Sequence, residues 1–199
     1  MARPAGPDRI AAAPDLAAGV EAWQRWLKHE RRASPHTVAA YHRDILAFLS
    51  FLTLHHGRPP RLGDLDRLTR ADLRSWLAAR AADDLQPTST ARALSVVRSF
   101  FRYLARNGQL DNAVMASVRT PRLPRSVPKA LTAGEAAEAV DAVHELSEAP
   151  WIGKRDVAVL ALLYGCGLRI GEALSLCRGD VPVPKGDETL SLTITGKGR

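Results

Sequence analysis

The sequence is poor in cysteine and has no long hydrophobic run. With only two cysteines in 199 residues, Cys166 and Cys177, it cannot form a disulfide framework or supply four zinc ligands. Its longest apolar stretch, residues 157–168, contains two glycines and is too short to span a bilayer. The first 30 residues lack the apolar segment of a secretory signal. We therefore expect a cytoplasmic protein with no membrane span.

Motifs of several common enzyme classes are also missing. There is no G-x-S-x-G of serine hydrolases, no H-E-x-x-H of zinc proteases and no G-x-G-x-x-G of dinucleotide-binding folds. Four histidines lie in or just after one predicted helix, but their spacing does not bring them to one face: His36, His42, His55 and His56. We therefore expect neither a metal site nor a bound cofactor.

Lysine is scarce, whereas arginine is abundant: there are 5 lysines and 23 arginines. The formal net charge of +7 is uneven, since residues 1–124 hold 19 basic and 11 acidic residues while residues 125–199 hold 9 and 10. A guanidinium donates two parallel hydrogen bonds to a phosphate. The basic N-terminal part therefore points to a polyanion such as nucleic acid, although a merely solubilising surface would give the same charge.

Apolar residues at three- and four-residue spacing predict four helices, over about residues 16–31, 34–55, 69 onward and 89–107. Ser34, followed by proline, and Thr69, with an acid three residues on, are good N-caps. These helices predict an all-α domain over residues 16–119, after a flexible tail at residues 1–15. Within it, Arg98, Arg102 and Arg106 recur every four residues and form one stripe.

A proline-rich linker is predicted at residues 120–130, where no apolar period is visible. The second module, residues 131–199, is predicted to contain, in order, an alanine-rich helix after Thr132, an apolar core helix over 154–164, a helix over 169–177 and a half-buried strand over 189–194. A lone strand needs partners, so this module reads as the truncated start of an α+β domain. The expected fold class is mainly α.

Two cationic residues of the second module could carry chemistry. Arg169 has apolar neighbours in the sequence, where an unpaired charge is costly, so we expect Glu172 or a ligand to hold it. The arginine would then form either an internal ion pair or a preorganised phosphate clamp. Lys197 lies between two glycines on the expected hairpin turn, from which its ammonium could reach a site as a proton donor or phosphate contact.

Taken together, these residues resemble the tyrosine recombinase (phage integrase) family, and within it the XerC/XerD-like chromosome-dimer resolvases. Residues 34–46 resemble the family's S-x-x-T-x-x-x-Y-x-x-D-L helix, and residues 121–132 resemble the linker into its catalytic domain. Residues 164–174 resemble the box around the first catalytic arginine. Residues 195–198 are similar to the hairpin turn that carries the catalytic lysine.

This resemblance implies a SAM-like four-helix core-binding domain followed by the start of the catalytic domain. Arg169 would grip the non-bridging oxygens of the scissile phosphate, and Lys197 would protonate the departing 5′-hydroxyl. A tyrosine would hold the cut DNA as a 3′-phosphotyrosyl ester, without a metal or other cofactor. The second and fourth helices would cross the major groove of double-stranded DNA and contact it through His36, Thr37, Arg43, Ser89, Thr90, Arg98 and Arg102.

The resemblance also implies partners and a limit. The full-length enzymes act as tetramers with a second, XerD-like subunit in chromosome dimer resolution at cell division. The family's His-x-x-Arg pair and nucleophilic tyrosine would lie beyond residue 199, and the three tyrosines present are not in that place. We therefore expect this chain alone to be monomeric and unable to cleave DNA. A non-catalytic DNA-binding protein, a phage or mobile-element integrase and an all-α interaction protein are alternatives.

Overall fold

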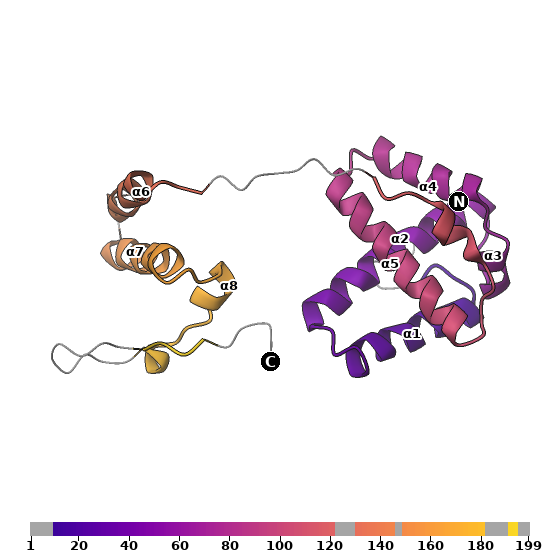
Figure 1. Cartoon of the computed structure of the whole chain (residues 1–199), viewed down its shortest axis with the longest axis horizontal. Coiled ribbons are helices and arrows are strands. Elements are labelled where there is room, and N and C mark those ends of the chain that lie inside the picture. The colour runs from indigo at the N-terminus through magenta and orange to yellow at the C-terminus, as the bar shows by residue number, and fades with distance from the viewer. Residues whose placement is uncertain (1–9, 122–129, 146–148, 182–190, 195–199) are drawn as a thin grey trace. The chain divides into compact units, whose positions relative to one another are not determined.

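A computed structural model of the chain describes residues 10–121, 130–145, 149–181 and 191–194. The chain divides into two units, Met1–Arg125 and Ser126–Arg199 (Figure 1). Every α-helix and 3-10 helix of the described residues belongs to one unit or the other, and these residues contain no strand. The mainly α fold class is therefore confirmed, while the exact limits of the predicted domains and linker stay predictions.

The N-terminal unit holds five α-helices and a 3-10 helix among its described residues: α1 (Pro14–His29), α2 (Pro35–His56), α3 (Leu62–Asp66), α4 (Arg70–Ala82), α5 (Pro87–Arg106) and η1 (Ala113–Ser117). The described part of the C-terminal unit holds α6 (Ala133–Glu145), α7 (Pro150–Gly165), α8 (Ile170–Ala173) and the 3-10 helix η2 (Arg178–Asp180).

The long helices begin and end at the signals that the sequence shows. Ser34 Oγ accepts a hydrogen bond from the backbone N–H of Thr37 at 3.2 Å, which caps α2. Gly57 ends that helix with a φ of +70°, a conformation that favours glycine. Thr69 and Asp72 form the predicted capping box of α4, and Asp72 accepts from the Thr69 backbone N–H at 2.8 Å. Helix α5 starts at Pro87, two residues before the predicted start, because proline fits a first turn.

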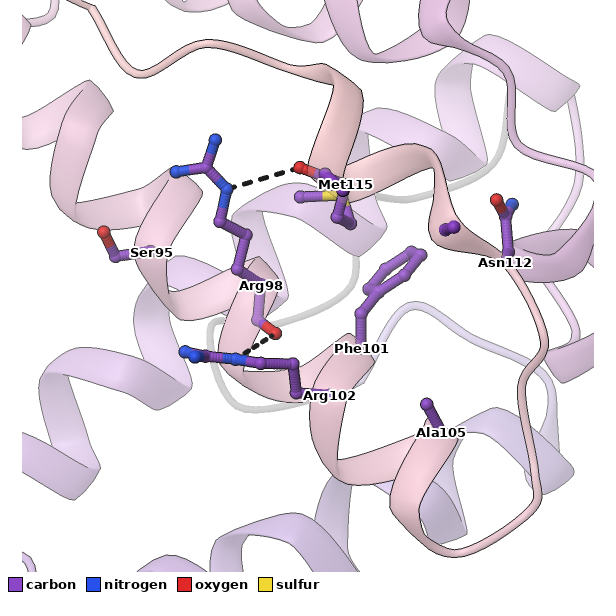
Figure 2. Close-up of a pocket in the computed structure, with 9 residues that line it drawn as sticks. Ser95, Arg98, Phe101, Arg102, Ala105, Asn112 and Met115 are labelled. Carbon is purple, nitrogen blue, oxygen red and sulfur yellow. Dashed lines mark hydrogen bonds between the residues drawn. The ribbon is translucent and has the colours of Figure 1, made fainter.

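The 3-10 helix η1 was not predicted from the sequence, and it lies against α5 (Figure 2). The side chains of Met115 and Val118 join the hydrophobic core, being 7% and 8% exposed. Asn112 caps η1 and also donates from Nδ2 to the backbone oxygens of Leu65 and Leu68, at 2.7 and 3.0 Å. These contacts join residues more than 40 positions apart, so no local pattern announces them.

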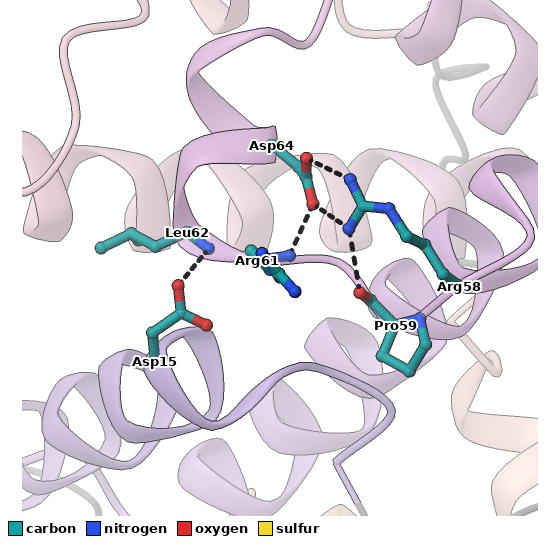
Figure 3. A network of polar contacts seen from close by, with 6 residues as sticks. All are labelled: Asp15, Arg58, Pro59, Arg61, Leu62 and Asp64. Atoms are coloured by element: carbon teal, nitrogen blue, oxygen red, sulfur yellow. Dashed lines mark hydrogen bonds and ion pairs between the residues drawn. The ribbon is translucent and has the colours of Figure 1, made fainter.

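The short helix α3 was also not predicted, and a polar network holds it (Figure 3). The Arg58 guanidinium donates to both carboxylate oxygens of Asp64, at 2.7 and 2.8 Å. Asp64 also accepts from the backbone N–H of Arg61 at 2.7 Å. At the start of α3, Asp15 accepts from the Leu62 backbone N–H at 3.0 Å and ties this helix to the start of α1.

The prediction of a flexible tail up to residue 15 is wrong from Ile10 onward. Ile10 and Ala12 pack against the core, and helix α1 already begins at Pro14. The backbone N–H of Ala13 donates to the Pro60 carbonyl at 2.9 Å, and Thr53 Oγ1 donates to the Ala11 carbonyl at 2.9 Å. These bonds anchor the entry to α1 on the end of α2 and the loop after it.

Large aromatic side chains form the centre of the N-terminal unit. Trp23, Phe48, Trp76 and Phe100 are each no more than 2% exposed. The rings of Phe48 and Trp76 meet edge to face with centroids 4.9 Å apart, and Trp23 meets Phe100 at 5.4 Å. Because α1, α2, α4 and α5 all contribute to this cluster, burying it fixes the helices against one another.

The described part of the C-terminal unit has little core of its own. Its buried hydrophobic residues are Ala136 and Ala173, whereas Trp151, Tyr164 and Leu174 are more than half exposed. The prediction that residues 154–164 form a core helix is therefore right about the helix and wrong about its burial. Too few of the described residues pack against α7 to cover its apolar side chains.

Further expectations for this unit differ from the structure. Helix α8 covers Ile170–Ala173, shorter than the predicted 169–177. Residues 191–194 have no regular secondary structure, so the described part of the predicted strand is not formed. Cys166 and Cys177 are both exposed. No helix in the described residues is long and apolar enough to cross a membrane.

The aromatic core gives a direct test of the fold. Replacing Trp76 by alanine should lower the free energy of unfolding by about 3–5 kcal/mol, because it leaves a cavity beside Phe48. Urea denaturation followed by far-ultraviolet circular dichroism measures the loss. The matched control is Trp151→Ala, at a side chain that is 64% exposed, which should change stability by no more than about 0.5 kcal/mol. Equal losses in the two variants would contradict the structure.

Acid should weaken the α3 network. The side-chain bond from Arg58 and the backbone bond from Arg61 lower the pKa of Asp64 from its usual 3.8 to about 2. Because the folded pKa lies below the unfolded value, this stabilisation is complete above pH 3.8 and is lost as the pH falls through about 2.

At neutral pH, Asp64→Asn should therefore lose about 1–2 kcal/mol of unfolding free energy, discounted for the exposed Arg58. The difference in unfolding free energy between this variant and the wild type should disappear as the pH falls from about 4 to about 2. Asp83→Asn, on the exposed end of α4, is the control. A gap that stays constant with pH would show that the Asp64 carboxylate charge is not what stabilises α3.

Candidate nucleic-acid interface

A polar cavity of about 440 Å³ opens where α1, α2 and α5 meet. We call it the arginine pocket. Its wall comes from the end of α1, the start of α2 and the last three turns of α5. The lining residues are Trp26, Leu27, Arg31, Ala33, Thr37, Tyr41, Ser95, Ser99, Arg102, Tyr103 and Arg106.

The lining carries three arginines and no acidic residue. Among the described residues, no carboxylate lies within ion-pair distance of Arg31, Arg102 or Arg106. The Arg31 guanidinium stacks over the Trp26 ring at 5.6 Å, and Arg102 Nε donates to the Arg98 carbonyl at 3.3 Å. Three like charges around one cavity repel one another, so the site is matched to an anion.

The start of α2 strengthens this positive field. The backbone N–H groups of a helix's first turn carry partial positive charge, and α2 is a helix of 22 residues. Thr37 in that turn lines the pocket, and its hydroxyl shares a hydrogen bond of 2.9 Å with Ser34 Oγ. Hydroxyl, guanidinium and aromatic groups together suit a phosphate group and an adjoining sugar or base.

An ion pair holds α2 and α5 in register beside the pocket. Asp44 is buried, and Arg92 donates to its two carboxylate oxygens from Nε and Nη2 at 3.0 and 3.4 Å. The hydrogen bond and charge of Asp44 raise the pKa of the Arg92 guanidinium. Asp44 belongs to the sequence pattern of residues 34–46, and the structure shows what it does: it fixes the two helices that carry the pocket.

The structure places the expected DNA contacts of α2 on the outside of the unit. His36 and Arg43 are exposed, and Thr37 is half-buried in the arginine pocket. On α5, Arg102 is exposed and lines the same pocket. The structure therefore brings Thr37 and Arg102 together although they are 65 positions apart in the sequence.

Of the other three expected contacts on α5, Thr90 and Arg98 bond inside the protein through their side chains and Ser89 through its backbone carbonyl. Thr90 is buried, and its hydroxyl accepts from Arg80 Nε at 3.4 Å, so its side chain is not offered to a duplex. Ser89 is half-buried, and its carbonyl accepts from Arg80 Nη2 at 3.4 Å. Arg98 is half-buried and donates to the Met115 carbonyl (Figure 2), and also to the Val118 carbonyl and the Thr120 hydroxyl.

Two arginines of the pocket are absent from the contacts expected from the sequence. Arg106 was visible in the stripe with Arg102, one helical turn apart. Arg31 gave no signal beyond a cation at a helix end, because only the packing of α1 on α5 brings it to the others. The described residues contain no group of three or more metal-ligating side chains.

Arg169 lies in the C-terminal unit at the start of α8. Its guanidinium donates to Glu172 Oε1 at 2.7 Å, and its backbone N–H donates to Oε2 at 2.9 Å. The Arg169 side chain is 71% exposed, so the expected apolar burial is wrong for the arginine, whereas the side chain of its partner Glu172 is 15% exposed. Lys197 lies outside the described residues, so its role as a proton donor or phosphate contact stays a prediction.

Comparison with known proteins now adds to this geometry. Residues 20–108 match the family model described as phage integrase, N-terminal SAM-like domain. Over 189 residues the chain is 46% identical to the tyrosine recombinase XerC of Rhodospirillum centenum, spanning 95% of this chain and 54% of that protein. The chain is therefore similar to the tyrosine recombinase family. Tyrosine recombinases XerC of Mesorhizobium japonicum and Rhizobium meliloti are 46% and 48% identical, over 95% and 93% of this chain and 60% and 57% of their own length.

The resemblance stated from the sequence is thus confirmed, together with its SAM-like domain. The chain spans 54–60% of the length of the curated relatives named above. No solved structure matches the chain. The region matched by the family model, residues 20–108, contains all three arginines of the pocket.

Unpaired charge in the arginine pocket should cost stability in the free protein. Arg102 has like-charged neighbours one turn away on both sides, Arg98 and Arg106. Arg102→Gln should therefore raise the free energy of unfolding by about 0.2–0.5 kcal/mol at low ionic strength. Thermal or urea denaturation measures the gain, which should vanish at about 0.5 M salt as charges are screened.

Arg58→Gln is the control with the opposite sign, because Arg58 has its own carboxylate partner in Asp64. It should lower stability at low salt. If Arg102→Gln were destabilising at low salt, the pocket would not be a site of unrelieved repulsion.

Proposed function

We propose that the chain is the DNA-binding unit and the first catalytic segment of a XerC-like site-specific tyrosine recombinase. The observation that carries this proposal is the arginine pocket, three guanidinium groups without a carboxylate partner in the described residues, within the region that matches the phage integrase SAM-like domain. Similarity to tyrosine recombinases XerC over nearly the whole chain supports the same assignment. Chromosome dimer resolution at cell division, in the cytoplasm, is the role we propose for the full-length enzyme.

In this proposal, α2 and α5 present one face to double-stranded DNA. Arg31, Arg102 and Arg106 each neutralise a phosphate of the DNA backbone around the pocket, and Thr37 adds a hydroxyl at the positive end of α2. His36 and Arg43, on the outside of α2, extend the contact along the duplex. Phosphate contacts set the register on DNA, so the exposed polar side chains of α2 can then reach base edges.

The C-terminal unit would contribute the first catalytic groups. Arg169, at the start of α8, would stabilise charge on the scissile phosphate, with Glu172 holding its guanidinium until DNA arrives. Lys197 would protonate the leaving 5′-hydroxyl. Downstream of Arg169 the sequence holds no histidine and no tyrosine, so we propose that the chain alone binds without cutting.

The full-length recombinase would work as a tetramer with a second, XerD-like subunit, and the present chain would be a monomer in solution. A non-catalytic DNA-binding role is the second candidate, and the arginine pocket favours it because it would serve binding without any chemistry. A phage or mobile-element integrase is a further variant of the first proposal.

DNA binding should depend steeply on salt. Fluorescence anisotropy with a labelled duplex should show affinity falling as salt rises from about 50 to about 200 mM. Changing Arg31, Arg102 and Arg106 together to glutamine should reduce the slope of log affinity against log salt by about 3, roughly 0.9 for each phosphate that is no longer neutralised.

The matched control removes the same charge elsewhere: Arg67, Arg70 and Arg74, all exposed and outside the pocket, are changed to glutamine. Its slope should fall by much less. Equal reductions would mean that only net charge matters, and no binding by the wild type would favour an interaction protein. A covalent adduct with a nicked recombination site on a denaturing gel would refute the statement that the chain alone does not cut.

A further inference from the structure

Arg98, which lies in the stripe of α5 with Arg102 and Arg106, makes hydrogen bonds that its neighbours do not. Its guanidinium donates from Nη1 to Thr120 Oγ1 at 2.7 Å, from Nε to the Met115 carbonyl at 3.4 Å, and from Nη2 to the Val118 carbonyl. Figure 2 shows the Arg98 side chain turned toward η1. These three partners lie along the segment by which the chain leaves the N-terminal unit.

The segment needs such an anchor. Residues 110–121 run back over α5 after the helix has ended; Leu110, Met115 and Val118 pack into the core, whereas Arg119 and Thr120 are exposed. A cavity of about 590 Å³ lies between α5 and η1, lined in part by Phe101, Ala105, Met115 and Ala116. Because the segment leaves the core after Val118, hydrogen bonds carry its attachment at Thr120.

Two polar residues supply hydrogen bonds to the segment. Asn112 fixes the start of η1 to the end of α3 and the turn after it through the carbonyls of residues 65, 66 and 68. Arg98 fixes its end, because the carbonyls of Met115 and Val118 and the Thr120 hydroxyl all accept from one rigid fork. A guanidinium can satisfy several diverging acceptors at once, which a lysine ammonium does less well.

Arg98 is also joined to the arginine pocket. The Arg98 carbonyl accepts from Arg102 Nε at 3.3 Å, and Arg102 lines the pocket. Consecutive turns of α5 thus carry one arginine toward the proposed DNA phosphate and one toward the departing chain.

We propose that Arg98 is a positioning residue that fixes the path along which the chain leaves the DNA-binding unit toward the unit carrying Arg169. It does so by holding Met115, Val118 and Thr120, and it does not contact the duplex. The anchoring stands by itself, while its use in delivering the catalytic unit to DNA rests on the proposed function.

Two measurements on the full 199-residue chain test the inference. In hydrogen–deuterium exchange, Arg98→Gln should speed exchange of the peptide covering residues 113–120 by about tenfold, because hydrogen bonds to a charged group are removed. Thr120→Val removes one acceptor without touching α5 and should speed the same peptide by less. The double variant should exchange no faster than Arg98→Gln, since both changes break the same interaction.

The second measurement is the salt slope of DNA binding. Arg98→Gln should leave it unchanged, whereas Arg102→Gln should lower it by about 1 and leave exchange at residues 113–120 unchanged. If Arg98→Gln lowered the slope like Arg102→Gln without altering exchange, Arg98 would be a DNA contact and the inference would fail.

Global unfolding is separable from local release. If Arg98→Gln also sped exchange around Trp76, the whole unit would be destabilised, and Thr120→Val would be the deciding variant. Unchanged exchange of residues 113–120 in Thr120→Val would then overturn the anchoring role. If no variant and no wild-type chain bound DNA, the proposed function would fail while the exchange data still judged the anchor.

Discussion

The packing of α5 against α2 is the constraint on which the rest of the N-terminal unit depends. One side of α5 is built of fully buried side chains such as Leu94, Val97 and Phe100. The buried Asp44 of α2 forms an ion pair with Arg92 of α5. The two helices therefore cannot slide without disrupting both the apolar packing and this ion pair. With that register fixed, the arginines on the remaining surface of α5 have definite and different surroundings.

Those surroundings explain why identical side chains one turn apart do different work. Arg98 is covered by the chain that follows α5 and satisfies its backbone, while Arg102 faces the cavity shared with α1 and α2. Charge without a partner is unfavourable in the free protein, and protein surfaces usually intersperse the two signs. The unpartnered positive charge of the arginine pocket is explained if a polyanion supplies the missing negative charge.

The two units differ in how far they are stabilised by their own residues. The N-terminal unit closes a continuous core from Leu16 to Val118. The described part of the C-terminal unit buries little beyond two alanines and leaves Trp151 and Leu174 exposed. The free energy of unfolding therefore depends mainly on the first unit, and a change at the exposed Trp151 of α7 should leave it nearly unchanged.

The sequence by itself determined the elements whose signals lie within one or two helical turns. Caps at Ser34 and Thr69, the apolar period of α2 and α5 and the excess of arginine before residue 125 depend only on near neighbours, and they predicted the all-α fold and an anionic partner. The motif around Arg169 indicated the family by resemblance, but it did not predict that the Arg169 side chain is exposed. Only the tertiary structure decided that Arg31 joins Arg102, that Thr90 is buried and that Arg98 turns away to hold residues 115–120. These outcomes follow from contacts between segments 10 to 70 positions apart, and a pattern read one turn at a time contains no information about which segment will cover which face.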